Sequence, residues 1–212
     1  MIRRMRAHEL PAVAGTLARA FYDDPALSWT FPRDDRRMGQ AERFWTIRLT
    51  HMAPQDEIYV TDDLSAAAAW TLPGRWHVSM RETRQLGRMM LGRRLPMLFR
   101  GLQRLERAHP HAPPHFYLAV IGTDPSRQGE GLGTALLQPM LDICDGDGVC
   151  AYLESSKERN VDYYSRFGFR VLQEVRLPKG PPMWPMWREP VSAAATGDVF
   201  ASQAFSAARG DQ

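Results

Sequence analysis

Three glycines at alternate positions interrupt an otherwise apolar part of the chain. The stretch "RQGEGLG", residues 127–133, follows the apolar run "HFYLAVIGTD" and overlaps the start of "LGTALLQPMLDIC". Glycine is costly in an ordered backbone because it loses more conformational freedom on folding than other residues. A strand, a glycine-rich turn and a helix start together form an anion site, because the first amides of a helix have no internal acceptors. The stretch therefore predicts a strand–turn–helix unit that binds an anionic ligand.

Two nucleotide-binding motifs contain a similar turn, and the sequence departs from both. A Walker loop needs Gly-Lys-Ser/Thr, but Thr134 follows Gly133 without a lysine. A dinucleotide fingerprint fits Gly129 and Gly131, and Glu154 stands near the expected distance for a ribose contact. Its third glycine position, however, is Thr134, and more than half of the chain precedes the turn. Nucleotide triphosphatase and dehydrogenase chemistry are therefore disfavoured.

Hydrophobic periodicity divides the rest of the chain into strands and helices. We expect strands over 1–6, 57–63, 65–72, 115–124, 149–156, 168–177 and 183–189. We expect helices over 8–21, 40–52, 132–144 and 160–167, a turn-rich stretch between the first two, and a helical insertion over about 75–109. Residues 1–189 are predicted to form a single domain. The alanine- and serine-rich tail 190–212 is either loose or held as a short helix by Phe200 and Phe205.

The glycine-rich stretch resembles the acyl-CoA signature of the GCN5-related N-acetyltransferase (GNAT) family, Arg/Gln-x-x-Gly-x-Gly/Ala. The resemblance implies an α/β (α+β) fold with a central mixed, mostly antiparallel sheet flanked by helices. In that fold the strands over 115–124 and 149–156 are parallel and splay apart. It also implies that the backbone of Ile121, Gly122 and Thr123 holds the pantetheine of acetyl-CoA. The residues that would hold the pyrophosphate are Gln128, Gly129, Glu130, Gly131, Leu132, Gly133 and Thr134.

A second motif of the same family lies downstream at the right distance. The stretch "RNVDYYSRFGF" matches Asn-x-x-x-Tyr-x-x-x-Gly-Phe from Asn160 to Phe169. By resemblance, Asn160 hydrogen-bonds the pantetheine arm and Tyr164 protonates the departing thiolate. A phenol with a pKa of about 10 and a thiol with a pKa of about 8.5 are close enough for that proton transfer. The adjacent Tyr163 is expected to be a core residue.

The two motifs do not identify the general base. Many family members carry a glutamate in the strand before the glycine turn, and Tyr117 stands there in this chain. The alternatives are Glu154, whose pKa partial burial would raise, His115, or a water relay that uses backbone carbonyls. Of these three candidates for the general base, we rank Glu154 first. A zinc site built from His109, His111 and His115 has poor, proline-broken spacing, so no metal is expected.

Composition and charge narrow the classes of partner. The chain has 212 residues, 44% of them hydrophobic, and 27 basic against 24 acidic residues give a net charge of only +3. This balance does not imply nucleic acid. We expect neither a membrane span nor a signal peptide, and therefore a cytoplasmic protein. The two cysteines, Cys144 and Cys150, are too few for a disulfide framework and are expected to be buried.

Over roughly residues 1–188 the chain resembles the branch of the family that contains puromycin N-acetyltransferase. This resemblance implies a bacterial acetyl-CoA-dependent transferase that acetylates a primary amine of a small molecule by direct transfer in a ternary complex. The first two helices and the insertion 75–109 would build the acceptor pocket, although their aromatic residues could equally be core. The alternative is a GNAT-fold sensor or partner protein that binds acyl-CoA without transferring the acyl group. A monomer and a homodimer are both compatible with the resemblance.

Overall fold

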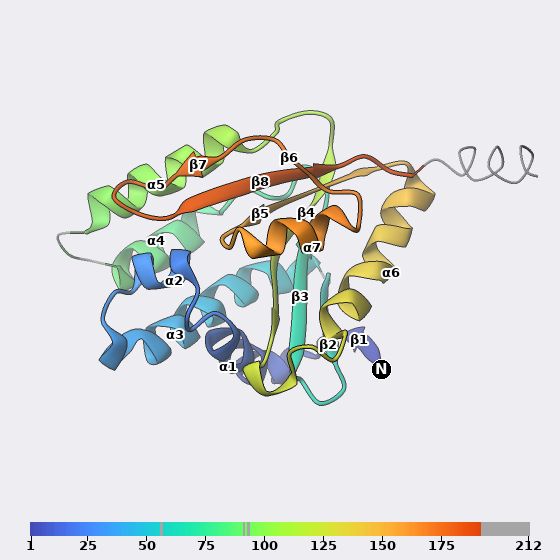
Figure 1. The fold of residues 1–212 in the computed structure, drawn as a ribbon. Coiled ribbons are helices and arrows are strands. Elements are labelled where there is room, and N and C mark those ends of the chain that lie inside the picture. Colours follow the sequence, from blue (N-terminus) through green and yellow to red (C-terminus); the bar gives the residue numbers. More distant parts are fainter. Residues whose placement is uncertain (56, 91, 93, 192–212) are drawn as a thin grey trace, which may run out of the picture.

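The fold is built on one mostly antiparallel sheet (Figure 1). The structure is a computed structural model that describes residues 1–55, 57–90, 92 and 94–191. The strand order is β1-β2-β3-β4-β5-β8-β6, with β7 also paired to β8, and of these neighbours β4 and β5 form the parallel pair. The strands are β1 Ile2–Arg4, β2 Ile58–Thr61, β3 Ala66–Thr71, β4 His115–Thr123, β5 Cys150–Ser155, β6 Arg170–Val171, β7 Val175–Arg176 and β8 Pro182–Arg188. The predicted fold class is confirmed.

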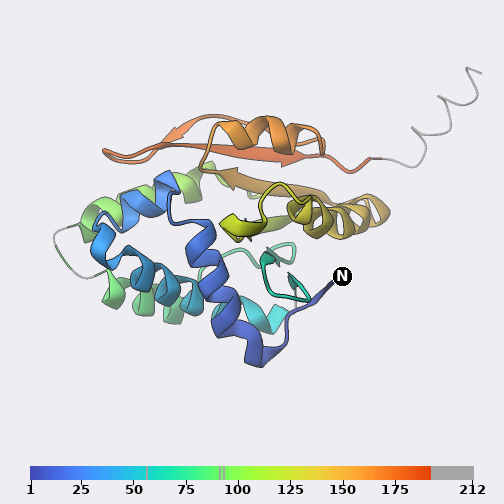
Figure 2. The same cartoon turned by 60° about the horizontal axis from the view of Figure 1, so that its bottom comes forward.

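Helices cover both faces of this sheet (Figures 1 and 2). They are α1 Leu10–Ala20, α2 Pro25–Thr30, α3 Asp34–Met52, α4 Met80–Met89, α5 Leu95–Ala108, α6 Leu132–Asp147 and α7 Arg159–Ser165. Helices α1 and α3 pack on one face, and α6 packs on the other. Within the described residues, no helix is both long and apolar enough to span a bilayer.

The alanine run of β3 explains how two helical layers approach one sheet so closely. Ala67 and Ala69 lie in the hydrophobic core beneath α1 and α3. Ala66 and Ala68 lie in the opposite core beneath α6, together with Trp70. Successive side chains of a strand point to opposite faces, and all five are buried. The small methyl groups let the helices on both sides pack near the strand.

Strands β4 and β5 pair over only part of their length. The parallel pairing runs from His115 with Cys150 to Leu118 with Leu153 and then ends. At the same point β4 bulges, because Leu118 pairs with Trp70 and Val120 pairs with Ala69, which leaves Ala119 without a partner on β3. Beyond the bulge β4 is paired to β3 on one side, and in the described part of the chain no strand pairs with its other edge. The predicted splayed pair is confirmed.

Two predictions about local structure are wrong. The turn-rich stretch before residue 34 contains α2, and α3 begins at Asp34 rather than near residue 40. The strand expected over 168–177 is broken into β6 and β7, whose registers on β8 differ by one residue. The break lies opposite Pro185, whose carbonyl accepts from Leu172 N but which has no N–H to donate in return.

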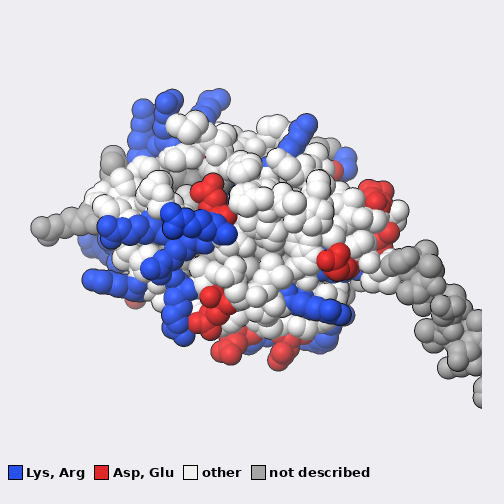
Figure 3. Space-filling view, turned by 90° about the horizontal axis from the view of Figure 1, so that it is seen from above, with Lys and Arg blue, Asp and Glu red and all other residues white. Residues whose placement is uncertain are grey.

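The insertion forms the helices α4 and α5, as its periodicity predicts; Leu91, part of that pattern, lies outside the described residues. Its arginines on these two helices are exposed, and Figure 3 shows basic side chains gathered at this end of the molecule. They form the solvated helix face that is the ordinary arrangement for such a charge run. The expected tail helix around Phe200 and Phe205 also lies outside the described residues. The single domain over 1–189 stays a prediction.

Gly122 of β4 is required by the packing of α1 on the sheet. A Cβ at this position would lie 2.9 Å from Leu17 Cδ2, 3.0 Å from Phe21 Cε2 and 3.1 Å from Ala20 Cβ. Gly122→Ala is therefore expected to lower the free energy of unfolding by about 1–3 kcal/mol, the usual cost of overpacking. The matched control is Gly39→Ala in the interior of α3, where a Cβ meets nothing within 4 Å.

The control substitution is expected to raise the free energy of unfolding by about 0.5–1 kcal/mol, since alanine loses less backbone freedom in a helix. Urea unfolding of both variants checks the pair. Equal stability of Gly122→Ala and the wild type would show that α1 does not approach β4 so closely.

Candidate active site

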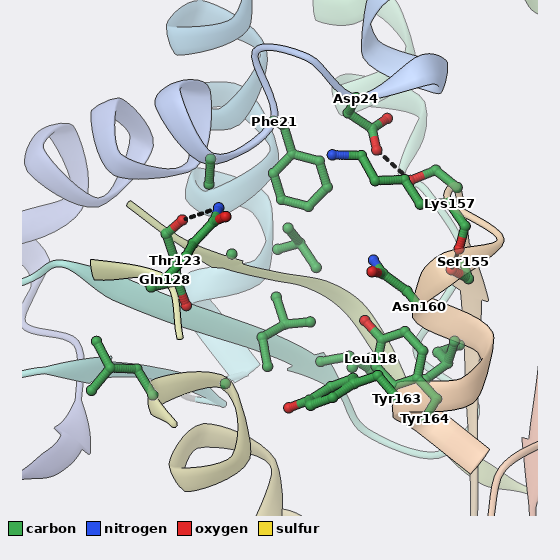
Figure 4. A pocket seen from close by; sticks show the side chains of 18 of the residues that line it. Phe21, Asp24, Leu118, Thr123, Gln128, Ser155, Lys157, Asn160, Tyr163 and Tyr164 are labelled. Carbon is green, nitrogen blue, oxygen red and sulfur yellow. Dashed lines mark hydrogen bonds between the residues drawn. The ribbon is translucent and has the colours of Figure 1, made fainter. Parts of the chain in front are cut away.

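A cavity of about 600 Å³ lies in the gap between β4 and β5 (Figure 4). Its wall is formed by the end of α1, the unpaired edge of β4, the glycine turn with the start of α6, the end of β5, and α7. Twelve of the thirteen predicted site residues line it: Ile121, Gly122, Thr123, Gln128, Gly129, Gly131, Leu132, Gly133, Thr134, Glu154, Asn160 and Tyr164. Residues far apart in the sequence therefore meet around one space.

Glycine is required at the three positions before and at the start of α6 for different structural reasons. Gly129 and Gly131 have φ values of 88° and 78°, which L side chains rarely adopt. Gly131 is the N-cap residue of α6 and provides no side-chain cap, so the first amides of the helix lack a cap acceptor. A Cβ on Gly133 would lie 3.0 Å from the hydroxyl of Tyr163. Together the three glycines keep bare amides at the cavity wall.

The predicted binding residue Glu130 does not line the cavity. Its carboxylate accepts two hydrogen bonds from Arg127 Nε, at 2.7 and 2.9 Å, on the protein surface. That ion pair holds the Glu130 side chain away from the gap. The basic residues Arg127, Lys157, Arg159 and Arg166 do line the cavity, and of these Arg127 is paired with Glu130 and Asp63.

Tyr164 and Asn160 reach the cavity from α7 (Figure 4). Tyr164 is 8% exposed and packs edge-on against Phe169 at a centroid distance of 6.1 Å. Burial, with smaller effects of Tyr163 and Asp24, raises the pKa of Tyr164 well above its usual value. Its phenol therefore keeps its proton at neutral pH, and it is a weaker acid than an exposed phenol.

Glu154 lies at the end of β5, on the sheet face toward α3 and α5. Its carboxylate accepts from Tyr117 Oη and from Tyr152 Oη, each at 3.1 Å. Burial raises the pKa of Glu154, while the two tyrosine hydrogen bonds and the charge of Arg48 lower it. Tyr117, at the position where many family members carry a glutamate, thus donates to a carboxylate on the neighbouring strand.

His115, the alternative base, does not line the cavity. It is 2% exposed, and its ring nitrogens lie within 2.9 Å of His109 Nε2 and of the Pro113 carbonyl. Within the described residues, no three histidine, cysteine, aspartate or glutamate side chains are placed to hold a metal ion.

Asp24 and Ser156 are cavity residues that the sequence did not single out. One carboxylate oxygen of Asp24 accepts from Ala26 N at 2.9 Å and Leu27 N at 3.1 Å, which caps α2. Its other oxygen accepts from the Ser156 hydroxyl after β5. The Asp-Pro pair at residues 24 and 25 is a typical helix N-terminus and could have predicted α2, but not this contact across 132 positions.

Comparison with known proteins agrees with this geometry. The acetyltransferase (GNAT) family model matches residues 19–169, well over half of the chain. An uncharacterised N-acetyltransferase of Schizosaccharomyces pombe is 26% identical over 208 residues, which cover 89% of this chain and 83% of the relative.

Two solved structures show the same fold. One, a Corynebacterium glutamicum protein described as histone acetyltransferase HPA2 and related acetyltransferase, has a TM-score of 0.70 at 22% identity over 90% of this chain and 96% of that one. Arylalkylamine N-acetyltransferase 2 of Aedes aegypti has a TM-score of 0.61 at 11% identity over 89% and 98% of the two chains. The family match and the relatives together lead to one conclusion: the protein belongs to the acetyltransferase (GNAT) family.

Proposed function

We propose that this acetyltransferase moves the acetyl group of acetyl-CoA to a primary amine of a small molecule, by direct transfer in a ternary complex. One observation carries the proposal. A single cavity joins the uncapped start of α6, the unpaired edge of β4, the buried phenol of Tyr164 and the carboxylate of Glu154, whose side chain is 13% exposed. An acyl donor, an acid and a base all need to meet in such a space.

The cavity residues fit acetyl-CoA, the acyl donor of GNAT enzymes. The free edge of β4 at Ile121, Gly122 and Thr123 can pair with the amide groups of pantetheine as a strand would. The amides at the start of α6 and the nearby basic side chains suit the pyrophosphate. Gln128 Nε2 donates to the Thr123 carbonyl at 3.2 Å and so ties the turn to the strand (Figure 4).

In the proposed mechanism the amine attacks the thioester carbonyl while Glu154 accepts the amine proton and Tyr164 donates a proton to the sulfur. A backbone amide of β4 near the bulge stabilises the oxyanion. A covalent acetyl-enzyme is not needed. Burial raises the pKa of Cys144 to about 12 and that of Cys150 to about 11, and neither cysteine lines the cavity.

The acceptor side of the cavity supports an amine with an apolar or aromatic body. Phe21 and Trp45 line it and pack together at a centroid distance of 5.2 Å, with Asp24 and Glu154 as acidic neighbours. An arylalkylamine N-acetyltransferase among the structural neighbours is consistent with this class. Membership of the puromycin N-acetyltransferase branch stays part of the proposal. The bacterial source, the cytoplasmic location and the choice between monomer and homodimer stay predictions.

Release of free thiol from acetyl-CoA, measured with a panel of small amines that includes puromycin, tests the proposed function. Amine-dependent release, with the acetylated amine identified by mass spectrometry, is the expected result. The alternative is a protein that binds acyl-CoA as a sensor. Tight binding of acetyl-CoA without an acetylated product from any amine of the panel would favour it.

Gly131→Ala is expected to weaken acetyl-CoA binding about 10-fold, because an L side chain at a left-handed φ costs about 1–2 kcal/mol and displaces the first amides of α6. Gly146→Ala, near the other end of α6, is the matched control, since a Cβ there meets nothing within 4 Å. Isothermal titration calorimetry compares the two variants. If Gly131→Ala bound acetyl-CoA with wild-type affinity, the glycine turn would not be part of the acetyl-CoA site.

Tyr164→Phe is expected to lower kcat about 100-fold with little change in the KM for acetyl-CoA, because the variant loses the proton donor and keeps the ring packing. Tyr163→Phe is the matched comparison: its hydroxyl lies near Gly133 and Thr134, so any effect should fall on the KM for acetyl-CoA. Steady-state kinetics at saturating amine separates the two outcomes. Full turnover by Tyr164→Phe would remove the acid step.

Glu154→Gln is expected to lower kcat about 100-fold or more by removing the base. The wild-type kcat should fall as the pH drops through the raised pKa of Glu154, because only the ionised carboxylate accepts the proton. The control is Glu57→Gln, since Glu57 also accepts from a tyrosine, Tyr59, but lies outside the cavity wall. A pH–rate profile that is identical in Glu154→Gln and the wild type would contradict the assignment.

A further inference from the structure

A chain of buried polar side chains runs from the cavity to the end of the helical insertion. Glu154, which accepts from Tyr117 and Tyr152, lies 4.0 Å from Nδ1 of His109, the residue after α5. Nε2 of His109 lies 2.9 Å from Nε2 of His115. The two histidines are 4% and 2% exposed, and neither lines the cavity. The mechanism above uses Glu154 and gives neither histidine a role.

The hydrogen bonds fix which ring nitrogen carries hydrogen in each histidine. Nδ1 of His115 lies 2.9 Å from the carbonyl oxygen of Pro113, which can only accept, so this nitrogen donates. Burial lowers the pKa of both histidines, that of His109 to about 3, so both rings are neutral. Nε2 of His115 must then accept from Nε2 of His109. Nδ1 of His109 is left with a lone pair beside the carboxyl group of Glu154.

This lone pair cannot bond to an ionised carboxylate, but it can accept from a protonated one. We infer that His109 is a positioning residue for the base: once Glu154 has taken a proton from the amine, its O–H donates to Nδ1 of His109, and the separation of 4.0 Å between Oε1 and Nδ1 closes to hydrogen-bond distance. The inference rests on the proposed function, in which Glu154 is the base. It also gives the insertion, which ends in His109, a part in the chemistry.

The proton transfers balance. The N–H bond of the amine breaks and leaves its electron pair on nitrogen, while an O–H bond forms on Glu154 and is directed to His109. The sulfur receives its proton from Tyr164, whose phenolate regains one as Glu154 releases its own. A neutral amine therefore yields no net proton, and an ammonium ion yields one to solvent.

The surroundings of the pair show why His109 matters for the strength of the base. The titratable and charged groups around Glu154 and His109 are Tyr117, Tyr152, Arg48, His77, His111 and His115. The two tyrosines and Arg48 favour the ionised form of Glu154. His109 is also held by Trp76, which stacks on its ring at a centroid distance of 3.7 Å. An acceptor beside the carboxyl group favours the protonated form, so its removal should weaken the base.

The test compares His109→Phe with His109→Asn in the full-length protein. Phenylalanine keeps an aromatic ring against Trp76 and removes both nitrogens, whereas the asparagine oxygen replaces the acceptor at Nδ1. The control is His111→Phe, an exposed histidine that also contacts Trp76, at a centroid distance of 5.7 Å, but has no hydrogen bond to His109 or His115. The Glu154 carboxyl carbon, assigned with Glu154→Gln, is titrated by ¹³C NMR, and kcat is measured against pH.

We expect the midpoint of the Glu154 titration to move to lower pH in His109→Phe, with kcat about 10-fold lower. In His109→Asn and His111→Phe the midpoint should stay near its wild-type pH. An unmoved midpoint in folded His109→Phe, or an equal shift in His109→Asn, overturns the inference. If His109→Phe does not fold, ¹⁵N NMR of the wild-type histidines decides. Hydrogen on Nδ1 of His109 at neutral pH overturns the inference, and hydrogen on Nε2 supports it. Neither NMR measurement requires turnover. The inference about His109 can therefore fail or hold independently of the thiol-release assay that tests the transferase proposal.

Discussion

The site depends on the end of the pairing between β4 and β5. After Leu118 and Leu153 the two strands part, and the bulge at Ala119 turns the remainder of β4 so that one edge stays on β3 while the other faces the gap. Unpaired backbone groups at a strand edge attract a further strand-like partner. Because the strands diverge there, a cavity opens between them, the unpaired backbone edge of β4 lines it, and Glu154 at the end of β5 reaches it.

Helices packed on the two faces of the sheet reach the cavity from different sides. The alanines of β3 let α1 and α3 lie close on one face and α6 on the other, so the start of α6 and the end of α1 reach the same cavity from opposite sides. The start of α6 presents amides, the segment from Lys157 to Arg166 presents basic residues, and the side of α1 and α3 presents Phe21, Trp45 and Asp24. In the proposed reaction the donor lies against α6 and α7, the acceptor lies against α1 and α3, and the two meet between Tyr164 and Glu154.

Local sequence signals predicted the donor side better than the acceptor side. Glycines at positions 129 and 131 and the downstream Tyr164 belong to short motifs, so their positions followed from spacing and resemblance. The contacts of Glu154 with Tyr117 and of Asp24 with Ser156 join distant segments and depend on the sheet register, which no local pattern gives. The strand expected over 168–177 was wrong because its pairing depends on Pro185 in another strand. Glu130 is the predicted site residue that does not line the cavity, because its side chain pairs with Arg127 on the surface.

The most direct test of the account is a crystal structure of the protein with CoA and an acetylated amine product. We predict that the pantetheine lies along the free edge of β4 at residues 121–123, with the sulfur beside the hydroxyl of Tyr164 and the product nitrogen on the side of Glu154. CoA bound outside the gap between β4 and β5, or a sulfur atom remote from Tyr164, would contradict the account.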